Sequence, residues 1–275
     1  MGGHLALLRP GNGAVAASAV FAGAIAVAGP AAVAEPLWRL VAAGAGAAFC
    51  FIGAGNALND YFDRDIDRAA HPDRPIPSGR VSPRAALGGA AGLFGAALAL
   101  AATVSLTALL IVGGLALLML AYEAVLKARG LVGNLAIGVL SGATFWFGGI
   151  VVGNTTSTLS LAALGVLATL GREVAKDNQD MEADKGRRTL PQRVGAGRAS
   201  GVSAGATLAA VALSPAPFFP LAVLGFAYIP AIAAADATFI YAAYLARAAP
   251  GRSQRWSKVG MALATLAFTA GGWLR

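Results

Sequence analysis

The amino-acid sequence predicts an all-helical protein that crosses a membrane several times. Its 275 residues are 57% hydrophobic and only 12% charged, whereas soluble domains carry about 25% charged residues. The mean hydropathy is +0.68, and the 36 glycines are typical of helices that pack closely in lipid. The apolar runs are too long and regular for a disordered low-complexity chain. A single cysteine excludes an internal disulfide framework.

Nine apolar segments approach the length of roughly 20 residues that a helix needs to cross a bilayer. They are residues 14–34, 38–58, 85–104, 106–124, 132–152, 158–174, 199–214, 218–243 and 257–273. The first segment ends in AVA, which is similar to a signal-peptide cleavage site, but its apolar stretch is too long for a signal peptide. We therefore expect nine transmembrane helices around a central cavity, in a single domain that covers residues 1–275.

The basic residues predict the orientation of these spans. If the N-terminus is cytoplasmic, 19 of the 21 Lys and Arg residues fall in segments on that side, and only Arg39 and Arg275 do not. Cytoplasmic loops of membrane proteins are enriched in Lys and Arg. We therefore expect a multi-pass protein of the plasma membrane with a cytoplasmic N-terminus. The same bias explains the net charge of +8, so we expect membrane lipid and no nucleic acid as a partner.

Acidic residues are concentrated in two of these cytoplasmic segments, and the orientation rule does not require them there. Nine of the 13 Asp and Glu residues form two clusters, one after the second span and one after the sixth. The clusters are Asp60, Asp63, Asp65, Asp67 and Asp73, and then Asp177, Asp180, Glu182 and Asp184. Topology alone leaves this pattern unexplained.

The spacing within each cluster places carboxylates on one face of a helix. In NDYFDRDID, Asn59, Asp63 and Asp67 are four residues apart, and Asn56 and Asp60 fall near the same stripe. The second cluster repeats acids at i, i+3 and i+7, and residues three and four apart are neighbours on a helix surface. Two like charges about 4 Å apart repel by on the order of 4 kcal/mol near a protein surface. Such a face requires a cation.

The donor atoms predict which cation is bound. Oxygen ligands without nearby His or Cys suit Mg²⁺ or Ca²⁺ rather than zinc. Mg²⁺ uses one or two carboxylates and completes its coordination with water and substrate phosphates, so two facing helices could hold Mg²⁺ ions bridged by a diphosphate. The predicted metal ligands are Asn59, Asp63, Asp67, Asp177, Asp180 and Asp184. The alternative is a solvated loop in which the acids pair with local arginines such as Arg64 and Arg68.

The two clusters are followed by similar sequences, which indicates an internal repeat. RPIPSGRVSPRAAL follows the first cluster and RTLPQRVGAGRASG follows the second. The clusters are also separated by four predicted spans. Repeated halves in membrane proteins often contribute opposite walls of one site. We therefore expect two related halves, residues 1–130 and 131–275, that each supply one acidic wall.

At these residues the sequence resembles the UbiA superfamily of intramembrane prenyltransferases. The family motif NDxxDxxxD is matched by NDYFDRDID, and the motif DxxxD is matched by Asp180 and Asp184. The finer pattern is most similar to the digeranylgeranylglyceryl phosphate synthase branch, which adds the second isoprenoid chain of archaeal ether lipids. LRPGN at 8–12, residues 59–82, YEAVLKARGLVGN at 122–134 and residues 172–191 carry this similarity. In YEAVLK, relatives often have a small hydroxyl residue after the Tyr, so the role of Glu123 stays open.

The resemblance implies Mg²⁺-dependent transfer of a geranylgeranyl group from its allylic diphosphate to the glycerol hydroxyl of geranylgeranylglyceryl phosphate. It implies catalytic roles for Asp60, Asp63, Asp180 and Lys127. Arg9 and Lys127 are expected to hold the acceptor phosphate, and Asp60 is a candidate general base. The expected substrate-binding residues are Arg9, Asn12, Asn56, Arg74, Arg80, Tyr122, Lys127, Arg172, Lys176 and Lys185. Aromatic faces stabilise cations, and the candidates for stabilising an allylic cation are Tyr61, Tyr122, Phe145 and Trp146.

Other functions fit parts of the pattern. The acceptor could be aromatic, for example 4-hydroxybenzoate or another quinone precursor. A cation transporter would also need acids, although transporter sites usually lie near the bilayer midplane. A CDP-alcohol phosphotransferase concentrates its acids in one long signature with DG and AR elements, and this chain lacks that signature. Asp236, inside the eighth span, is either a functional intramembrane acid or a locally paired residue near the cytoplasmic interface, and Asn134 is expected to cap the fifth span.

Overall fold

A computed structural model of the chain describes residues 2–182 and 188–275, and within these ranges the regular structure is helical. Nine of the described helices have 18 to 26 residues. They are α2 (Pro10–Ala28), α3 (Leu37–Phe62), α5 (Pro83–Val104), α6 (Leu106–Ala124), α7 (Leu131–Val151), α8 (Leu159–Gln179), α10 (Ala196–Leu213), α11 (Tyr228–Leu245) and α12 (Pro250–Trp273). Shorter elements are α1 (Gly2–Leu8), η1 (Gly29–Val33), α4 (Arg64–Ala70), η2 (Leu126–Ala128) and α9 (Leu190–Val194). The all-helical prediction is confirmed for these residues.

Six of the described helices are long and apolar enough to cross a membrane: α2 with η1, α3, α5, α6, α7 and α11. α8 has similar length, but Arg172, Glu173 and Lys176 lie in its last turns. α10 and α12 are less apolar because polar or basic residues occupy their first turns. The protein is thus a multi-pass membrane protein, while the count of nine spans stays a prediction.

The predicted eighth span, 218–243, is wrong at its start, because α11 begins only at Tyr228. The preceding segment, residues 214–227, forms turns instead. Its backbone folds back on itself, with the amides of Val223 and Leu224 donating to the carbonyl of Pro217 at 2.8 and 3.0 Å. Prolines at 215, 217 and 220 lack the amide hydrogen that a helix interior needs. High apolarity in this segment therefore did not produce a helix.

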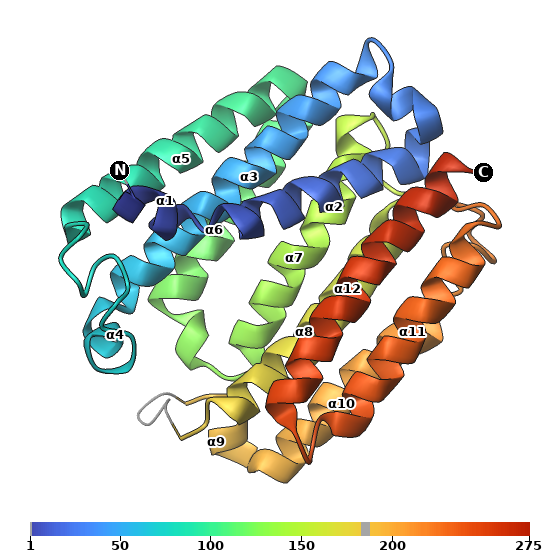
Figure 1. The fold of residues 1–275 in the computed structure, drawn as a ribbon. Helices are drawn as coiled ribbons and strands as arrows, with labels where there is room; N and C mark the ends of the chain where they lie inside the picture. Colours follow the sequence, from blue (N-terminus) through green and yellow to red (C-terminus); the bar gives the residue numbers. More distant parts are fainter. Residues whose placement is uncertain (1, 183–187) are drawn as a thin grey trace.

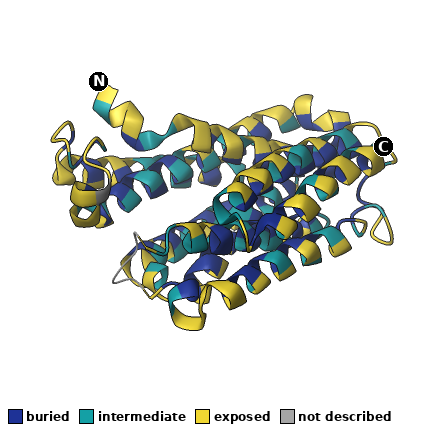
Figure 2. Ribbon diagram, turned by 60° about the horizontal axis from the view of Figure 1, so that its bottom comes forward, coloured by how far each residue is buried: buried dark blue, intermediate teal, exposed yellow. Residues whose placement is uncertain are grey.

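The helices pack side by side so that both acidic clusters lie at one end of the bundle. Figure 1 shows α4, which carries part of the first cluster, and α9, which lies beyond the second, at the same end, whereas the C-terminus lies at the other end. α3 packs against α2 and α5, and α7 packs against α2 and α8. The outward faces are exposed (Figure 2), and they carry large apolar side chains such as Leu106, Leu117 and Leu266. Such faces suit contact with lipid.

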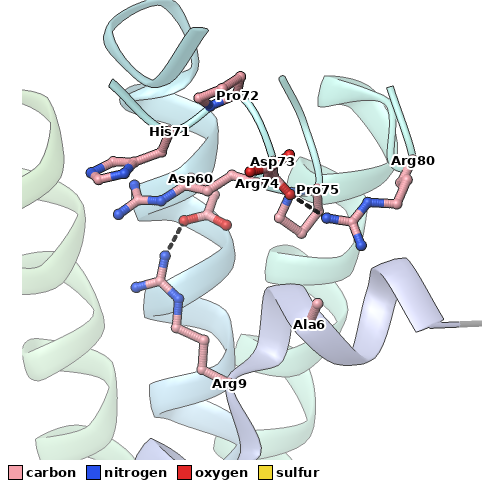
Figure 3. Close-up of a pocket in the computed structure, with 9 residues that line it drawn as sticks. All are labelled: Ala6, Arg9, Asp60, His71, Pro72, Asp73, Arg74, Pro75 and Arg80. Carbon is pink, nitrogen blue, oxygen red and sulfur yellow. Dashed lines mark hydrogen bonds and ion pairs between the residues drawn. The ribbon is translucent and has the colours of Figure 1, made fainter. Parts of the chain in front are cut away.

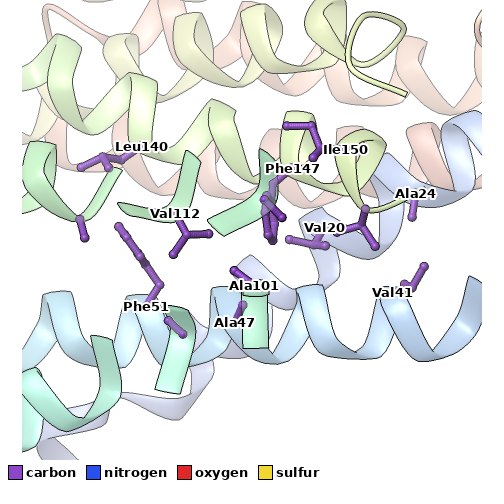
Figure 4. Close-up of a cluster of buried hydrophobic side chains, with 14 of the residues drawn as sticks. Val20, Ala24, Val41, Ala47, Phe51, Ala101, Val112, Leu140, Phe147 and Ile150 are labelled. Atoms are coloured by element: carbon purple, nitrogen blue, oxygen red, sulfur yellow. The ribbon is translucent and has the colours of Figure 1, made fainter. Parts of the chain in front are cut away.

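The interior below the acidic end is filled by small and medium apolar side chains. One cluster, drawn in Figure 4, joins α2, α3, α6 and α7 through residues such as Phe51, Val112 and Phe147. α2 and α7 approach so closely that a Cβ atom on Gly148 would lie 2.1 Å from the carbonyl oxygen of Val20. Glycine is required there because any side chain would force the two backbones apart. This packing fixes α7 beside the helices that carry the first cluster.

Candidate active site

The first acidic motif continues across the end of α3 without losing its helical stripe. α3 ends at Phe62, and Asp63 lies between it and α4 with an α-helical backbone. The amide of Asp63 donates to the carbonyl of Asn59 at 2.9 Å, and the amide of Asp67 donates to that of Asp63 at 2.8 Å. The i to i−4 pattern is therefore kept, and Asn59, Asp60, Asp63 and Asp67 form a cluster that we call the first ledge.

Two flanks of the first ledge face different neighbours. Asn59 and Asp60 are consecutive residues, so their side chains point about 100° apart around the helix. Asn59 points to the α6 side, where its side-chain amide lies 3.3 Å from Oε1 of Glu123. Asp60 forms an ion pair with Arg9 at the start of α2. The ledge is thus bordered by one set of partners from α6 and η2 and by another from the N-terminal helices.

Lys127 and Glu123 border the first flank. Lys127 Nζ lies 2.6 Å from Oδ2 of Asp63 and 3.1 Å from Oε2 of Glu123. The Glu123 side chain is only 3% exposed, so it adds a buried carboxylate to the site. The sequence pattern left the role of Glu123 open. The one indication that Glu123 belongs to the site was its position four residues before Lys127, which places both side chains on one helix face.

Arg9 and Arg74 border the second flank. Arg74 Nη1 lies 2.6 Å from Oδ2 of Asp67, whose side chain is 4% exposed. Arg9 has a left-handed backbone, φ 45°, at the break between α1 and α2, and Pro10 then opens α2. This break directs the Arg9 side chain toward Asp60. The LRPGN sequence therefore sets the position of a cation beside the first ledge.

Asn56 and Asn12 stabilise this break. The Asn56 side-chain amide donates to the carbonyl of Leu8 at 3.0 Å, and the Asn12 amide makes a long contact of 3.5 Å with Oδ1 of Asn56. Both residues were predicted to bind substrate. In the structure their described contacts are to the protein itself, so they support Arg9 from one helix turn below Asp60.

The second motif lies at the end of α8. Asp180 caps the helix, with its amide donating to the carbonyl of Lys176 at 2.9 Å, and Asp177 accepts a hydrogen bond of 2.9 Å from Nδ2 of Asn134. Asp177 and Asp180, which we call the second ledge, are both partly exposed. The predicted metal ligand Asp184 and the predicted substrate-binding residue Lys185 lie outside the described residues. Asn134 does not cap α7, because Gly130 occupies the N-cap position. It binds the second ledge instead.

Residues 122–134 bring the two ledges together. Lys127 binds Asp63 of the first ledge and Asn134 binds Asp177 of the second. The Tyr122 phenol lies within electrostatic reach of both of these carboxylates. The connection between α6 and α7 and the first turn of α7 therefore contact a carboxylate of each ledge.

Cations on α8 and α12 gather around Glu173, which lies one helical turn before Asp177 of the second ledge. Arg172 forms an ion pair with the neighbouring Glu173, and Lys176 Nζ lies 3.9 Å from the same carboxylate. Lys258, in the second predicted half of the chain, lies within electrostatic reach of Arg172, Glu173 and Lys176. The sequence pattern did not point to Lys258, because this residue is 82 to 86 positions away from Arg172, Glu173 and Lys176 in the chain. Only packing of α12 on α8 reveals it.

Several candidate residues lie elsewhere. Phe145 packs edge-to-face on Phe268, and Trp146 donates to the carbonyl of Thr155 beyond the end of α7. Both are more than 10 residues, or roughly 20 Å of helix, from the start of α7 at the ledges. Tyr61 lies under the guanidinium of Arg64. Of the four aromatic candidates, Tyr122 is the one whose side chain interacts electrostatically with carboxylates of both ledges.

Two other sequence expectations are also resolved by contacts. Asp236 accepts a hydrogen bond of 2.7 Å from Ser214, which follows the far end of α10 from the ledges. The acid is thus paired locally, but away from the site. Arg68 pairs with Asp65 at 2.9 Å on the exposed surface. Pairing with local arginines therefore accounts for Asp65, whereas the inward-facing acids bind residues from other elements.

The ledges fit Mg²⁺ by chemistry, but they do not form a closed cation cage. No group of three or more Asp, Glu, His or Cys side chains converges on one point within residues 2–182 and 188–275. Mg²⁺ needs only one or two carboxylates when substrate phosphates supply the remaining oxygens. Each ledge offers carboxylate oxygens and no nitrogen or sulfur ligand, which suits Mg²⁺ shared between protein and a bound diphosphate.

The geometry agrees with comparisons to known proteins. The UbiA prenyltransferase family profile matches residues 16–267 of this sequence. The chain belongs to the UbiA prenyltransferase family. It is 38% identical over 272 residues to the digeranylgeranylglyceryl phosphate synthase of Natronomonas pharaonis, covering 98% of this chain and 96% of that protein. The family resemblance expected from the two motifs is therefore confirmed, and the chain is a prenyltransferase.

Solved structures share this UbiA fold over nearly the whole chain. A structure of a digeranylgeranylglyceryl phosphate synthase in membranes superposes with a TM-score of 0.82 at 30% identity, covering 100% of this chain and 99% of that one. A UbiA homologue from Archaeoglobus fulgidus bound to DMAPP and Mg²⁺ superposes with a TM-score of 0.68 at 16% identity, covering 97% and 99%. Membership of an enzyme family argues against the transporter and the CDP-alcohol phosphotransferase alternatives.

Proposed function

We propose that this protein transfers a geranylgeranyl group from geranylgeranyl diphosphate to the glycerol hydroxyl of geranylgeranylglyceryl phosphate, in a reaction that requires Mg²⁺. The observation that carries the proposal is the convergence of two acidic ledges on the segment 122–134, in a chain similar to digeranylgeranylglyceryl phosphate synthases over 98% of its length. The proposed site faces the cytoplasm of a plasma-membrane protein with nine spans, because 19 of 21 basic residues lie in segments that this orientation places inside.

Asn59, Asp63 and Asp67 of the first ledge and Asp177 and Asp180 of the second would hold Mg²⁺, with Asp184 as a further candidate. The Mg²⁺-bound, diphosphate-bound form of the Archaeoglobus relative supports this assignment at the level of the fold. When bound, Mg²⁺ would neutralise negative charge on the diphosphate leaving group. Two related halves, 1–130 and 131–275, would then each supply one ledge.

The chain's own cations would bind the donor from between the ledges. Lys127 lies at Asp63, and Arg172 and Lys176 lie one or two turns before Asp180 on α8. These groups would stabilise charge that develops on the diphosphate as the allylic carbon–oxygen bond breaks. Tyr122, whose phenol interacts electrostatically with Asp63 and Asp177, would face the allylic cation. The acceptor oxygen then forms the new bond to the allylic carbon as the diphosphate leaves, and its proton passes to a base, for which Asp60 is the candidate.

The acidic end of the bundle also suits an amphipathic substrate. Polar groups of the ledges lie at the ends of α3 and α8, and the core below them is apolar. A diphosphate would therefore meet the carboxylates and their metal while the isoprenoid chain remains among apolar helices. An aromatic acceptor is the runner-up, because relatives with aromatic acceptors share the two metal motifs.

A product assay tests the proposal. Purified protein is given geranylgeranyl diphosphate with either geranylgeranylglyceryl phosphate or 4-hydroxybenzoate, with and without Mg²⁺. We expect a doubly alkylated glyceryl phosphate only with Mg²⁺ and the first acceptor. Prenylated 4-hydroxybenzoate in place of that product would contradict the proposed acceptor, and full turnover without any divalent cation would contradict the metal requirement.

A further inference from the structure

A polar cavity of about 470 Å³ opens on the flank of α3 that carries Asp60. Its polar lining comprises Arg9, Asp60, His71, Asp73, Arg74 and Arg80, and part of α1 closes one side. Figure 3 shows that these side chains come from the break between α1 and α2, from α3 and from the loop after α4. None of the other cations of the site, Lys127, Arg172 or Lys176, lines this cavity. The cationic residues of the site therefore fall into two groups.

Arginine side chains are the main polar groups of the cavity. Three guanidinium groups line it together with an imidazole and two carboxyl groups, and Arg9 and Arg74 are paired with Asp60 and Asp67. Arg80 donates to Oγ of Ser78 at 3.0 Å and to the backbone carbonyl of Asp73, and it has no carboxylate partner within 4.0 Å among the described residues. Guanidinium groups are matched to phosphate oxygens because they can donate two parallel hydrogen bonds. The cavity thus suits a phosphate group.

Asp60 adds an unsatisfied hydrogen-bond acceptor to the same cavity. Its side chain is 1% exposed, and one oxygen pairs with Arg9. The other oxygen, Oδ2, is buried and has no hydrogen-bond partner in the part of the chain that the structure describes. Buried polar atoms in native proteins are nearly always hydrogen-bonded. An ionised carboxylate oxygen can only accept, so the group expected at Oδ2 is a hydrogen-bond donor, such as the hydroxyl of a ligand.

We propose, on the basis of the function proposed above, that this cavity binds the head group of the acceptor. Arg9, Arg74 and Arg80 bind its phosphate, and Oδ2 of Asp60 accepts a hydrogen bond from its glycerol hydroxyl. The donor diphosphate is bound separately, between the ledges and beside Lys127, Arg172 and Lys176. A phosphate and an alcohol on one small ligand match the combination of cationic rim and buried acceptor, and Asp60 joins this cavity to the first ledge.

Arg80 offers the sharpest test, because it is exposed and contacts neither ledge. Steady-state transfer is measured with full-length enzyme, with acceptor varied at saturating donor and donor varied at saturating acceptor. We expect Arg80→Gln to raise KM for geranylgeranylglyceryl phosphate about tenfold, equivalent to about 1.4 kcal/mol, with kcat and donor KM within about twofold. The matched control is Arg84→Gln, since Arg84 is an exposed arginine in the first turn of α5 outside the cavity lining. It should leave all three constants unchanged.

A second measurement isolates the phosphate. The same two variants are assayed with geranylgeranylglycerol, which has the hydroxyl but no phosphate. Arg80→Gln should leave kcat/KM for this alcohol unchanged and so reduce the preference for the phosphorylated acceptor about tenfold. A merely structural role of Arg80 would lower both values together. Glycerol phosphate and inorganic phosphate are tested as inhibitors. If glycerol phosphate competes with the acceptor and inorganic phosphate does not, the cavity binds both the phosphate and the glycerol of the head group.

Three results would overturn this inference. An increase in donor KM with acceptor KM unchanged would assign the cavity to the diphosphate. Equal behaviour of Arg80→Gln and Arg84→Gln in both assays would exclude Arg80 from phosphate binding. If the unaltered enzyme transfers no prenyl group to geranylgeranylglyceryl phosphate, the proposed function fails first and the head-group site fails with it. Thermal unfolding of both variants separates these outcomes from a folding defect.

Discussion

The two ledges hold their carboxylates in different ways. In the first ledge, Asp60, Asp63 and Asp67 are buried, and each forms an ion pair with a cation outside α3 and α4. In the second ledge, Asp177 and Asp180 are partly exposed, and one hydrogen bond to Asp177 comes from the neutral amide of Asn134. Paired cations therefore offset the repulsion among the carboxylates of the first ledge, whereas solvent also reaches the carboxylates of the second.

The two acidic motifs are similar in sequence, but their carboxylates are not held equally firmly in the fold. Breaking a buried ion pair leaves an uncompensated charge in a medium of low dielectric constant, which is strongly destabilising. A partly exposed carboxylate is solvated when it loses a partner. We therefore expect both ledges to be needed for turnover, but the first to contribute far more to the stability of the fold.

The largest effect should come from removing the metal, because it acts on both ledges at once. Treatment with EDTA should lower prenyl transfer by on the order of a thousandfold, equivalent to about 4 kcal/mol of transition-state stabilisation. Added Mg²⁺ should restore turnover. Labelled geranylgeranyl diphosphate gives the rate directly. Retention of activity after exhaustive chelation would show that the ledges serve another purpose.

Single substitutions on opposite ledges should come next. Asp63→Ala and Asp180→Ala should each lower kcat by roughly 100-fold or more, because each removes charge stabilisation in the transition state. Despite similar losses of activity, only Asp63→Ala should alter the melting temperature markedly, since it leaves Lys127 without one of its two partners. Membrane yield and thermal unfolding serve as controls, and normal turnover in both variants would contradict the site assignment.

Lys127→Met tests the rigidity of the first ledge. It leaves Asp63 and the buried Glu123 without the cation that lies between them, so the free energy of unfolding should fall by about 3 kcal/mol. The more conservative Lys127→Arg should recover much of this loss. Denaturation monitored by circular dichroism in detergent provides the measurement. A change below about 0.5 kcal/mol would mean that the first ledge is no more preorganised than the second.

Asn134→Leu is the matching test on the second ledge. The variant removes one hydrogen bond to a partly exposed carboxylate, so stability should fall by only about 1 kcal/mol. Activity should fall about tenfold, the range seen when groups that orient metal ligands are lost. Comparison with Lys127→Met in the same detergent gives the contrast. A larger stability loss for Asn134→Leu than for Lys127→Met would reverse the proposed difference.

Asp65→Asn should have the smallest effect. Asp65 belongs to the first acidic cluster, but its side chain is 64% exposed and pairs with Arg68 on the surface. Exposed ion pairs contribute about 0–1 kcal/mol. The free energy of unfolding should therefore stay within about 0.5 kcal/mol of that of the unaltered protein, and kcat should stay within about twofold. A large loss of activity would extend the first ledge to the outer face of α4.

Several features of the fold and the site could be predicted because they depend on local chemistry. Composition predicted helices in a membrane, and the i, i+4 spacing of Asn59, Asp63 and Asp67 predicted a shared face, which survives the break at Phe62. The predicted start of the eighth span is wrong because the average apolarity of a segment takes no account of its three prolines, which prevent a helix there. The break at Arg9 was also missed, since a left-handed backbone at a residue other than glycine is uncommon.

Other features depend on contacts between distant segments and could not be predicted from spacing. Glu123 joins the first ledge through Asn59, 64 positions earlier. Lys258 reaches the cations of α8 only because α12 packs on that helix. Asn134 has the signature of a helix cap, yet its amide binds Asp177, 43 positions later. In each case the partner is set by helix packing, which the local sequence does not encode.

Hydropathy and helical periodicity are properties of neighbouring residues, so the amino-acid sequence alone predicts a helical membrane protein with two acidic faces that require a cation. Which carboxylates are buried beside cations, and which stay open to solvent, depends instead on which helices pack together. The same packing separates Arg9, Arg74 and Arg80 from Lys127, Arg172 and Lys176. The close approach of α2 and α7 at Gly148 is one of the contacts that hold these helices in place.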